Sequence, residues 1–142
     1  MRVLEVVSHS EEQTLELAQK LAKSFLPGDV VILTGALGSG KTTFVRGLVA
    51  ARGMDESQVS SPSYTFVNEY KGDLPIFHFD FYRMHDADEL EEIGWDYYMQ
   101  RNGLVLAEWG EKADGRLPER YYNMTFKVID QDSRKIEIQL IQ

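Results

Sequence analysis

The stretch Gly35-Ala36-Leu37-Gly38-Ser39-Gly40-Lys41-Thr42 matches the pattern G-x-x-x-x-G-K-[ST] of a phosphate-binding loop. Its glycines let the backbone come close to a phosphate and turn successive N–H groups toward it, at the positive end of the helix that follows. The Lys41 ammonium would reach the β- and γ-phosphates, and the Thr42 hydroxyl would bind Mg²⁺. Chance alone would produce this pattern in about one chain in two hundred of this length, given the average share of glycine in proteins. We therefore expect the loop to bind a nucleoside triphosphate.

The segments on either side of the loop favour an α/β fold. Residues 30–33 form a continuous apolar run, as in parallel strands that are buried on both faces. Residues 43–52 follow as a helix whose apolar positions recur at helical spacing, and Gly53 is placed to end it. This order of strand, loop and helix predicts a P-loop NTPase-like three-layer sandwich, with a mixed sheet that has a parallel core and antiparallel edge strands.

The rest of the chain alternates predicted strands and helices. Ser10 and Gln13 resemble a capping box at the start of a helix that ends before Pro27. The apolar patterns predict strands over residues 3–8, 64–70, 74–81 and 104–107, short helices over 86–93 and 95–101, and an antiparallel hairpin over 121–129 and 135–141 at the sheet edge. A chain of 142 residues has room for one core, so we expect residues 1–142 to form a single P-loop ATPase domain.

The composition limits the surroundings in which the protein acts. The net charge of −8 argues against a basic surface that binds nucleic acid directly, so any link to nucleic acid should run through a partner. The chain has no cysteine, which excludes disulfides and thiolate metal sites. A run of about eighteen apolar residues is absent, and the N-terminus lacks the apolar region of a signal peptide. We therefore expect a cytoplasmic protein with no membrane contact.

Two carboxylates follow predicted strands and are candidates for the metal site of a nucleotide hydrolase. Asp80 ends the strand over residues 74–81 and would bind Mg²⁺ through water, as a Walker B aspartate does. Glu108 follows the strand over residues 104–107 and could polarise an attacking water or join the metal shell. The plainer interpretations are a turn or cap carboxylate for Asp80 and a solvated strand end for Glu108.

A polar loop and several aromatic residues each allow two interpretations. Residues 60–65 lie where several P-loop enzymes keep a segment that responds to the γ-phosphate, but a plain proline-containing turn fits equally well. Trp109, Tyr64 and Phe66 could contact the base or ribose, or belong to the core.

Two histidines and one near match to a guanine-reading motif are further candidates for site residues. His78 and His85 have no metal-ligand partner at useful spacing, and we interpret both as structural or surface residues. Glu111-Lys112-Ala113-Asp114 has Glu where the guanine-reading N-K-x-D motif has Asn. The sequence therefore favours ATP over GTP.

Several segments occur in one order along the chain and together carry a resemblance. They are Gly28-Asp29-Val30-Val31, the phosphate-binding loop continued by Thr43-Phe44-Val45-Arg46-Gly47, Ser61-Pro62-Ser63-Tyr64-Thr65, His78-Phe79-Asp80-Phe81-Tyr82-Arg83 and Glu108-Trp109-Gly110-Glu111. In this order they resemble the TsaE family, formerly YjeE, of small bacterial P-loop ATPases. The resemblance covers nearly the whole chain. The P-loop is shared by many families, whereas the H-F-D-x-Y-R and E-W-x-E segments are specific to this one.

The resemblance implies an ATPase that is needed to make threonylcarbamoyladenosine (t6A) next to the anticodon of tRNA. In that pathway TsaD, paired with TsaB, transfers the threonylcarbamoyl group to tRNA. A TsaE protein joins the TsaB and TsaD proteins, and its ATP hydrolysis, slow alone, supports turnover of the complex. It would meet tRNA only indirectly, through that complex.

The resemblance also implies roles for individual positions of this chain. Lys41 and Thr42 would bind phosphate and metal, Thr43 would line the nucleotide site, and the switch-like loop would lie at residues 61–65. The ATP-binding residues are then Leu37, Gly38, Ser39, Gly40, Lys41, Thr42 and Thr43, the catalytic residues are Lys41, Asp80 and Glu108, and the Mg²⁺ ligands are Thr42, Asp80 and Glu108. Family members often have a carboxylate at position 36 and Thr at position 63, where this chain has Ala36 and Ser63.

Two other functions fit a P-loop of this kind. One is a small-molecule kinase, although such enzymes usually carry an arginine-rich lid, and the chain has no obvious insertion of that sort. The other is an adaptor that binds ATP without hydrolysing it and uses the nucleotide only to shape a docking surface.

Overall fold

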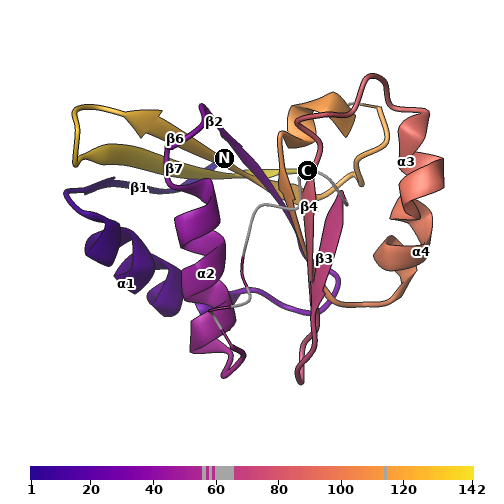
Figure 1. The fold of residues 1–142 in the computed structure, drawn as a ribbon, viewed down its shortest axis with the longest axis horizontal. Helices are drawn as coiled ribbons and strands as arrows, with labels where there is room; N and C mark the ends of the chain where they lie inside the picture. Colours follow the sequence, from indigo (N-terminus) through magenta and orange to yellow (C-terminus); the bar gives the residue numbers. More distant parts are fainter. Residues whose placement is uncertain (56, 58, 60–65, 114) are drawn as a thin grey trace.

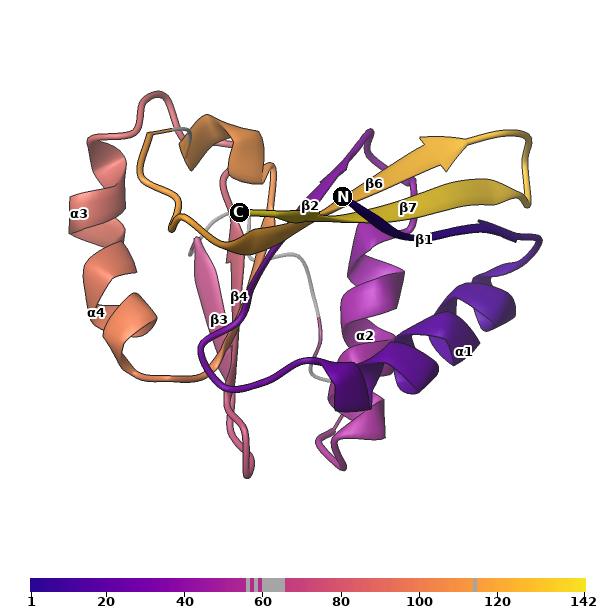
Figure 2. The ribbon, with the colours of Figure 1, turned by 180° about the vertical axis from the view of Figure 1, so that it is seen from behind.

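The computed structural model describes residues 1–55, 57, 59, 66–113 and 115–142. Within these residues the sheet has seven strands in the order β1-β7-β6-β2-β5-β4-β3 (Figures 1 and 2). The strands are β1 (Arg2–Ser8), β2 (Val30–Gly35), β3 (Val67–Tyr70), β4 (Ile76–Asp80), β5 (Leu104–Glu108), β6 (Tyr121–Val128) and β7 (Arg134–Ile141). The helices are α1 (Glu11–Leu21), α2 (Lys41–Ala51), α3 (Glu89–Ile93) and α4 (Trp95–Gln100), with 3₁₀ helices η1 (Ala22–Ser24) and η3 (Gly110–Ala113).

The centre of the sheet is parallel, as the sequence predicts. β5 pairs in parallel with β2 and with β4, and β6 pairs in parallel with the other side of β2. The remaining pairs, β1 with β7, β6 with β7 and β3 with β4, are antiparallel. The carboxyl ends of β2, β4 and β5 therefore lie at one edge of the sheet, which is where parallel sheets hold their ligands.

The predicted position of the C-terminal hairpin is wrong in one respect. β6 and β7 do form an antiparallel hairpin, but it is not at the sheet edge, because β6 pairs with β2 and β7 pairs with β1. β1 and β3 are the edge strands. Periodicity in a strand shows which of its side chains face the core, but it does not show which strand pairs with it. The position of β1 in the sheet was therefore not predicted.

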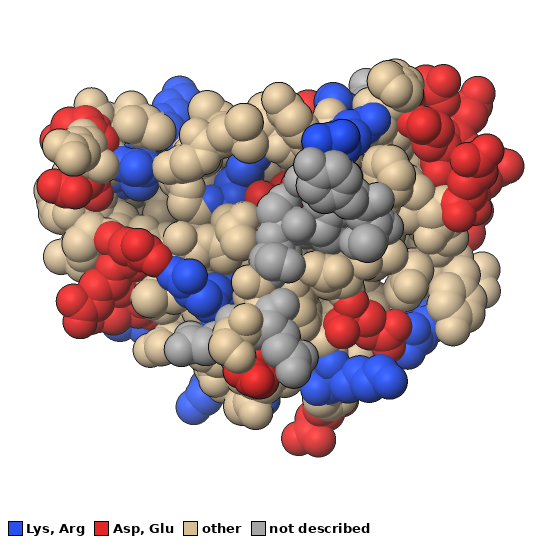
Figure 3. All heavy atoms as spheres, viewed as in Figure 1, with Lys and Arg blue, Asp and Glu red and all other residues tan. Residues whose placement is uncertain are grey.

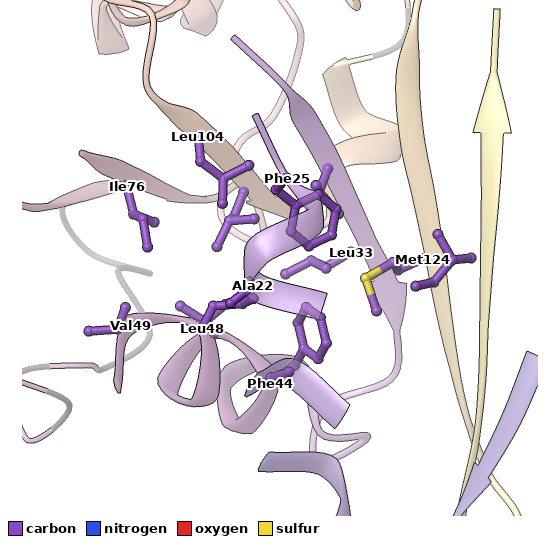
Figure 4. Packing of buried hydrophobic residues seen from close by; sticks show 14 of the residues in the cluster. Ala22, Phe25, Leu33, Phe44, Leu48, Val49, Ile76, Leu104 and Met124 are labelled. Carbon is purple, nitrogen blue, oxygen red and sulfur yellow. The ribbon is translucent and has the colours of Figure 1, made fainter. Parts of the chain in front are cut away.

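Helices cover both faces of the sheet and give the predicted three layers (Figures 1 and 2). On one face, α1 and α2 pack on a core that includes Leu33, Phe44, Leu48 and Met124 (Figure 4). On the other face, α3, α4 and η3 cover a second core of aromatic and aliphatic residues. β4 contributes to both cores by alternation: Ile76 faces the first, and Phe77 and Phe79 face the second, as does Phe81 directly after the strand.

The ends of several elements differ from their predicted positions. α2 begins at Lys41, earlier than predicted, because the left-handed Gly40 (φ 106°) ends the loop one residue before. β3 is described from Val67, and Phe66 directly before it takes a positive φ of 67°. Residues 64 and 65 of the predicted strand lie outside the described residues. The acidic helix α3 is shorter than predicted and starts at Glu89.

The start of α1 follows the predicted capping box in part. Ser10 Oγ accepts a hydrogen bond from the Gln13 backbone N–H at 3.0 Å, as an N-cap does. The Gln13 side chain accepts its bond from the N–H of His9 at 2.8 Å rather than from that of Ser10. Among the helices of the described residues, none combines the length and apolar character needed to span a bilayer.

Candidate functional site

A cavity of about 340 Å³ opens at the carboxyl ends of the central strands. Its walls come from the phosphate-binding loop and α2, from the ends of β4 and β5, from the start of α1 and from the turn between β6 and β7. The lining residues are Ser10, Glu11, Thr14, Leu37, Gly38, Gly40, Lys41, Thr42, Thr43, Asp80, Glu108, Trp109, Gln131, Asp132 and Arg134. The fold thus brings the candidate site residues together, except that the Ser39 side chain is not on the cavity wall.

The loop needs glycine for two separate reasons. Gly38 and Gly40 have φ angles of 78° and 106°, a region that residues with a Cβ rarely adopt. A Cβ on Gly35 would lie 2.6 Å from both the Phe126 backbone O and Ser39 Oγ, so the loop and β6 leave no room for it. Ser39 is buried, and within the described residues its hydroxyl has no hydrogen-bond partner. The Ser39 backbone N–H donates a hydrogen bond to the Ala36 carbonyl O at 3.1 Å, within the loop itself.

The Lys41 side chain is held at the loop. Its Nζ donates a hydrogen bond to the Gly35 carbonyl O at 2.6 Å and lies 4.1 Å from the centre of the Trp109 ring. Burial lowers the pKa of Lys41, and the nearby carboxylates Glu108, Asp80 and Glu111 oppose that shift. These contacts hold a cation where the pattern places the β- and γ-phosphates.

The two carboxylates lie side by side because β4 and β5 pair Asp80 with Glu108 in register. Each is only 3% exposed. Asp80 Oδ1 accepts a hydrogen bond from the Tyr82 backbone N–H at 2.9 Å, so it holds the following turn as well as lining the cavity. Glu108 accepts a bond from Thr42 Oγ1, which lies 3.3 and 3.4 Å from its two oxygens. The interpretation of Glu108 as a solvated strand end is excluded by its burial.

The donor atoms at this edge fit Mg²⁺. The described residues contain no group of three or more His, Cys, Asp or Glu placed to hold a metal by themselves. Mg²⁺ needs no such group, since it usually keeps several waters and is held by one or two carboxylates together with substrate phosphates. The Thr42 hydroxyl and the Glu108 carboxylate are adjacent hard oxygen donors, with Asp80 next to Glu108.

His78 has a contact that the sequence prediction missed. Its side chain is fully buried, and its Nε2 lies 2.5 Å from Oε2 of Glu108. The prediction that His78 is structural did not include a contact with a candidate site residue, whereas His85 is exposed, as expected for a surface residue. Alternation along β4 places His78 and Asp80 on the same face. That pattern would have predicted the contact with Glu108 only if the pairing of β4 with β5 had also been known.

Two walls of the cavity come from segments that carry no nucleotide-binding motif. Ser10 and Glu11 stand at the first turn of α1, and Arg134 starts β7. Arg134 Nη2 donates a hydrogen bond to the Gly38 carbonyl O at 3.2 Å, which ties the hairpin to the loop. No short sequence pattern could have identified these residues, because their approach depends on β6 lying next to β2.

Trp109 and Phe66 both pack against the second core. Trp109 also lines the cavity and is held in a left-handed conformation (φ 58°) directly after β5. Tyr64, the segment 61–65 and Asp114 lie outside the described residues.

Comparison with known proteins gives one consistent match. The family model described as Threonylcarbamoyl adenosine biosynthesis protein TsaE matches residues 8–136. The tRNA threonylcarbamoyladenosine biosynthesis protein TsaE of Bacillus subtilis is 37% identical over 137 residues, which are 96% of this chain and 85% of that protein. The protein of the same name from Aquifex aeolicus is 37% identical over 136 residues, 94% of each chain.

A solved structure matches the fold as well. The crystal structure of Bacillus subtilis YdiB aligns with a TM-score of 0.79 and 31% identity, covering 100% of this chain and 88% of that one. The mixed sheet between two helical layers, with a P-loop at the carboxyl end of β2, is the fold that the sequence predicts. The family model and these relatives agree, and this chain belongs to the TsaE family.

Proposed function

We propose that this chain is the ATP-binding and ATP-hydrolysing component of t6A synthesis on tRNA, and that residues 1–142 act as one ATPase domain. The observation that carries the proposal is the meeting of Lys41 and Thr42 with two buried carboxylates, Asp80 and Glu108, on the wall of one cavity. A P-loop alone binds phosphate, whereas hydrolysis also needs carboxylates that hold the metal and its waters.

Each residue has a role that follows from its position. The loop N–H groups and Lys41 would hold the β- and γ-phosphates, and Thr42 and Glu108 would bind Mg²⁺, with Asp80 holding it through water. When bound, Mg²⁺ would offset the charge that develops on the phosphates. Glu108 would also orient the attacking water, because its carboxylate faces the cavity beside Thr42. Thr43 and Leu37 line the same cavity and would contact the nucleotide.

The partners that we propose are TsaB and TsaD, and ATP hydrolysis would support turnover of their complex in the cytoplasm. The relatives are named for t6A biosynthesis on tRNA, yet this chain has a net charge of −8. Acidic side chains gather over α3 on the face shown in Figure 3. Direct binding to tRNA phosphates needs clustered Lys and Arg, so a protein partner must supply the tRNA contacts.

The experiment that tests this function measures ATP hydrolysis by the protein alone and after mixing with TsaB and TsaD. We expect the protein alone to hydrolyse ATP slowly, and we expect the rate to rise clearly when TsaB and TsaD are present. Lys41→Ala should bind ATP about 10-fold to 100-fold more weakly in calorimetry, because the charge-assisted bonds of the ammonium to the phosphates are lost. Lys20→Ala, at an exposed position of α1, is the matched control.

Two results would contradict the proposal. One is the absence of both association with TsaB and TsaD and stimulation of hydrolysis. The other is undiminished ATP affinity of Lys41→Ala. Phosphate transfer to a small acceptor in a single turnover, with no hydrolysis in water alone, would indicate a kinase instead.

A further inference from the structure

Behind the candidate metal site, polar groups form a chain from the half-buried Asn68 on β3 through β4 to β5. Asn68 Nδ2 donates a hydrogen bond to Tyr70 Oη at 3.4 Å. Tyr70 Oη lies 3.4 Å from Nδ1 of His78, and Nε2 of His78 lies 2.5 Å from Oε2 of Glu108. The chain ends at a carboxylate that lines the cavity, although His78 itself does not line it.

The directions of these hydrogen bonds indicate one tautomer of the His78 ring. A neutral imidazole has one donor nitrogen and one acceptor nitrogen. An ionised carboxylate can only accept, so Nε2 of His78 is the donor in its 2.5 Å contact with Glu108, and Nδ1 is the nitrogen that lies toward Tyr70 Oη. The proton of the ring then lies on Nε2, which donates to the Glu108 carboxylate.

We propose that His78 is a positioning residue for Glu108, an inference that rests on the ATPase function proposed above. The imidazole fixes Oε2 of Glu108 from behind the cavity. Oε1 is then directed to Thr42 Oγ1, 3.3 Å away, and to the place of the metal and the attacking water. A partner of this kind restricts both the rotation of a ligating carboxylate and its basicity.

The proposal predicts that the loss of Mg²⁺ dependence or kcat in variants at position 78 depends on whether the new side chain has an N–H donor, and not on its volume. His78→Leu fills similar space but has no polar atom, so Glu108 loses its partner. His78→Gln keeps an amide N–H that can donate to Oε2. His85→Gln, at an exposed histidine five residues beyond β4, is the matched control.

The test measures three quantities for each variant: ATP affinity without Mg²⁺, the Mg²⁺ concentration that gives half of the Mg²⁺-dependent rise in ATP affinity, and kcat. We expect His78→Leu to lose about 10-fold to 100-fold in Mg²⁺ dependence or kcat, with ATP affinity without Mg²⁺ unchanged. His78→Gln should recover most of the loss, and His85→Gln should match the wild type. Unchanged Mg²⁺ dependence and kcat in a folded His78→Leu protein would overturn the proposal, and so would a folded His78→Gln protein that recovers nothing.

A second measurement needs no substitution, and it applies if His78→Leu fails to fold. Nitrogen-15 NMR of the histidine rings in the wild-type protein distinguishes the two neutral tautomers and the doubly protonated ring. We expect a proton on Nε2 of His78. A ring that carries its proton on Nδ1 alone would overturn the assigned role.

The two proposals fail in different ways. If the wild-type protein neither binds nor hydrolyses ATP, the ATPase function fails, whatever the tautomer of His78. If ATP is bound and hydrolysed normally but position 78 has no influence on Mg²⁺ dependence or kcat, only the positioning role fails.

Discussion

The two carboxylates of the site are held by different kinds of group. Asp80 accepts a hydrogen bond from a backbone N–H, that of Tyr82 in the turn after β4. Glu108 is contacted by two side chains, Thr42 and His78. Because the Thr42 hydroxyl would turn to Mg²⁺ when nucleotide binds, the surroundings of Glu108 change with the ligand. We infer that Glu108 is the carboxylate that acts on the water.

Glu108→Gln tests that role with little damage to the structure. The amide keeps the size of the side chain, and its carbonyl O can still accept from His78, so the buried imidazole keeps its partner. We expect ATP binding to be retained, and kcat to fall by about 100-fold or more, because the group that activates water is lost. Calorimetry and a phosphate-release assay measure the two quantities.

Glu119→Gln, which removes an exposed carboxylate, is the control for the change in charge. Hydrolysis at the wild-type rate in Glu108→Gln would contradict the role of Glu108. Loss of hydrolysis with intact support of t6A synthesis would instead favour an adaptor that only binds ATP.

The sequence was most informative about single elements, because each element is largely decided by local patterns. The apolar run of residues 30–33 predicted a strand buried on both faces, and Val31 and Ile32 indeed face opposite cores. Ser10 predicted the start of α1. The start of α2 was misplaced, because the left-handed Gly40 lets the helix begin at Lys41. That conformation is a property of the folded loop, which helical periodicity does not report.

The close crossing of α1 and α2 allows a prediction about how tightly these two helices pack. A Cβ on Gly47 would lie 2.6 Å from Cβ of Ala18 and 3.0 Å from the Leu15 carbonyl O. Gly47→Ala should therefore lower the free energy of unfolding by about 1–3 kcal/mol through overpacking, although alanine favours a helix by about 1 kcal/mol over glycine. Urea denaturation measures the change.

The double variant Ala18→Gly with Gly47→Ala is the matched control for this crossing. Removing the Ala18 methyl makes room for the new one, so the double variant should be more stable than the sum of the two single changes predicts. A stabilising effect of Gly47→Ala alone would show that the helices can separate without cost.

At the scale of the whole molecule, the site is assembled from segments far apart in the chain. The motifs predicted the loop, Asp80 and Glu108, since each lies at the end of a recognisable strand. They did not predict Ser10 or Arg134, whose places depend on the sheet order. β1 pairs with β7 at the opposite end of the chain, and a pairing of that kind leaves no local pattern in either strand.

This assembly predicts that nucleotide binding stabilises the protein as one unit. The cavity is lined by residues from position 10 to position 134, which come from the sheet and from the layer of α1 and α2, and the second core packs on the other face of the same sheet. Mg²⁺ and ATP at 100 times the dissociation constant should add about 2.7 kcal/mol of stability, which raises Tm by an amount on the order of 10 °C for a chain of this size. Far-ultraviolet circular dichroism and the indole N–H signal of Trp95 in NMR spectra should report the same shift, since Trp95 is buried in the second core. In Lys41→Ala the shift should largely disappear at the same ligand concentration.

Two outcomes would contradict this coupling. One is a wild-type Tm that does not rise with ligand. The other is a second core, around Trp95, that melts at its unliganded temperature while the rest of the protein is stabilised.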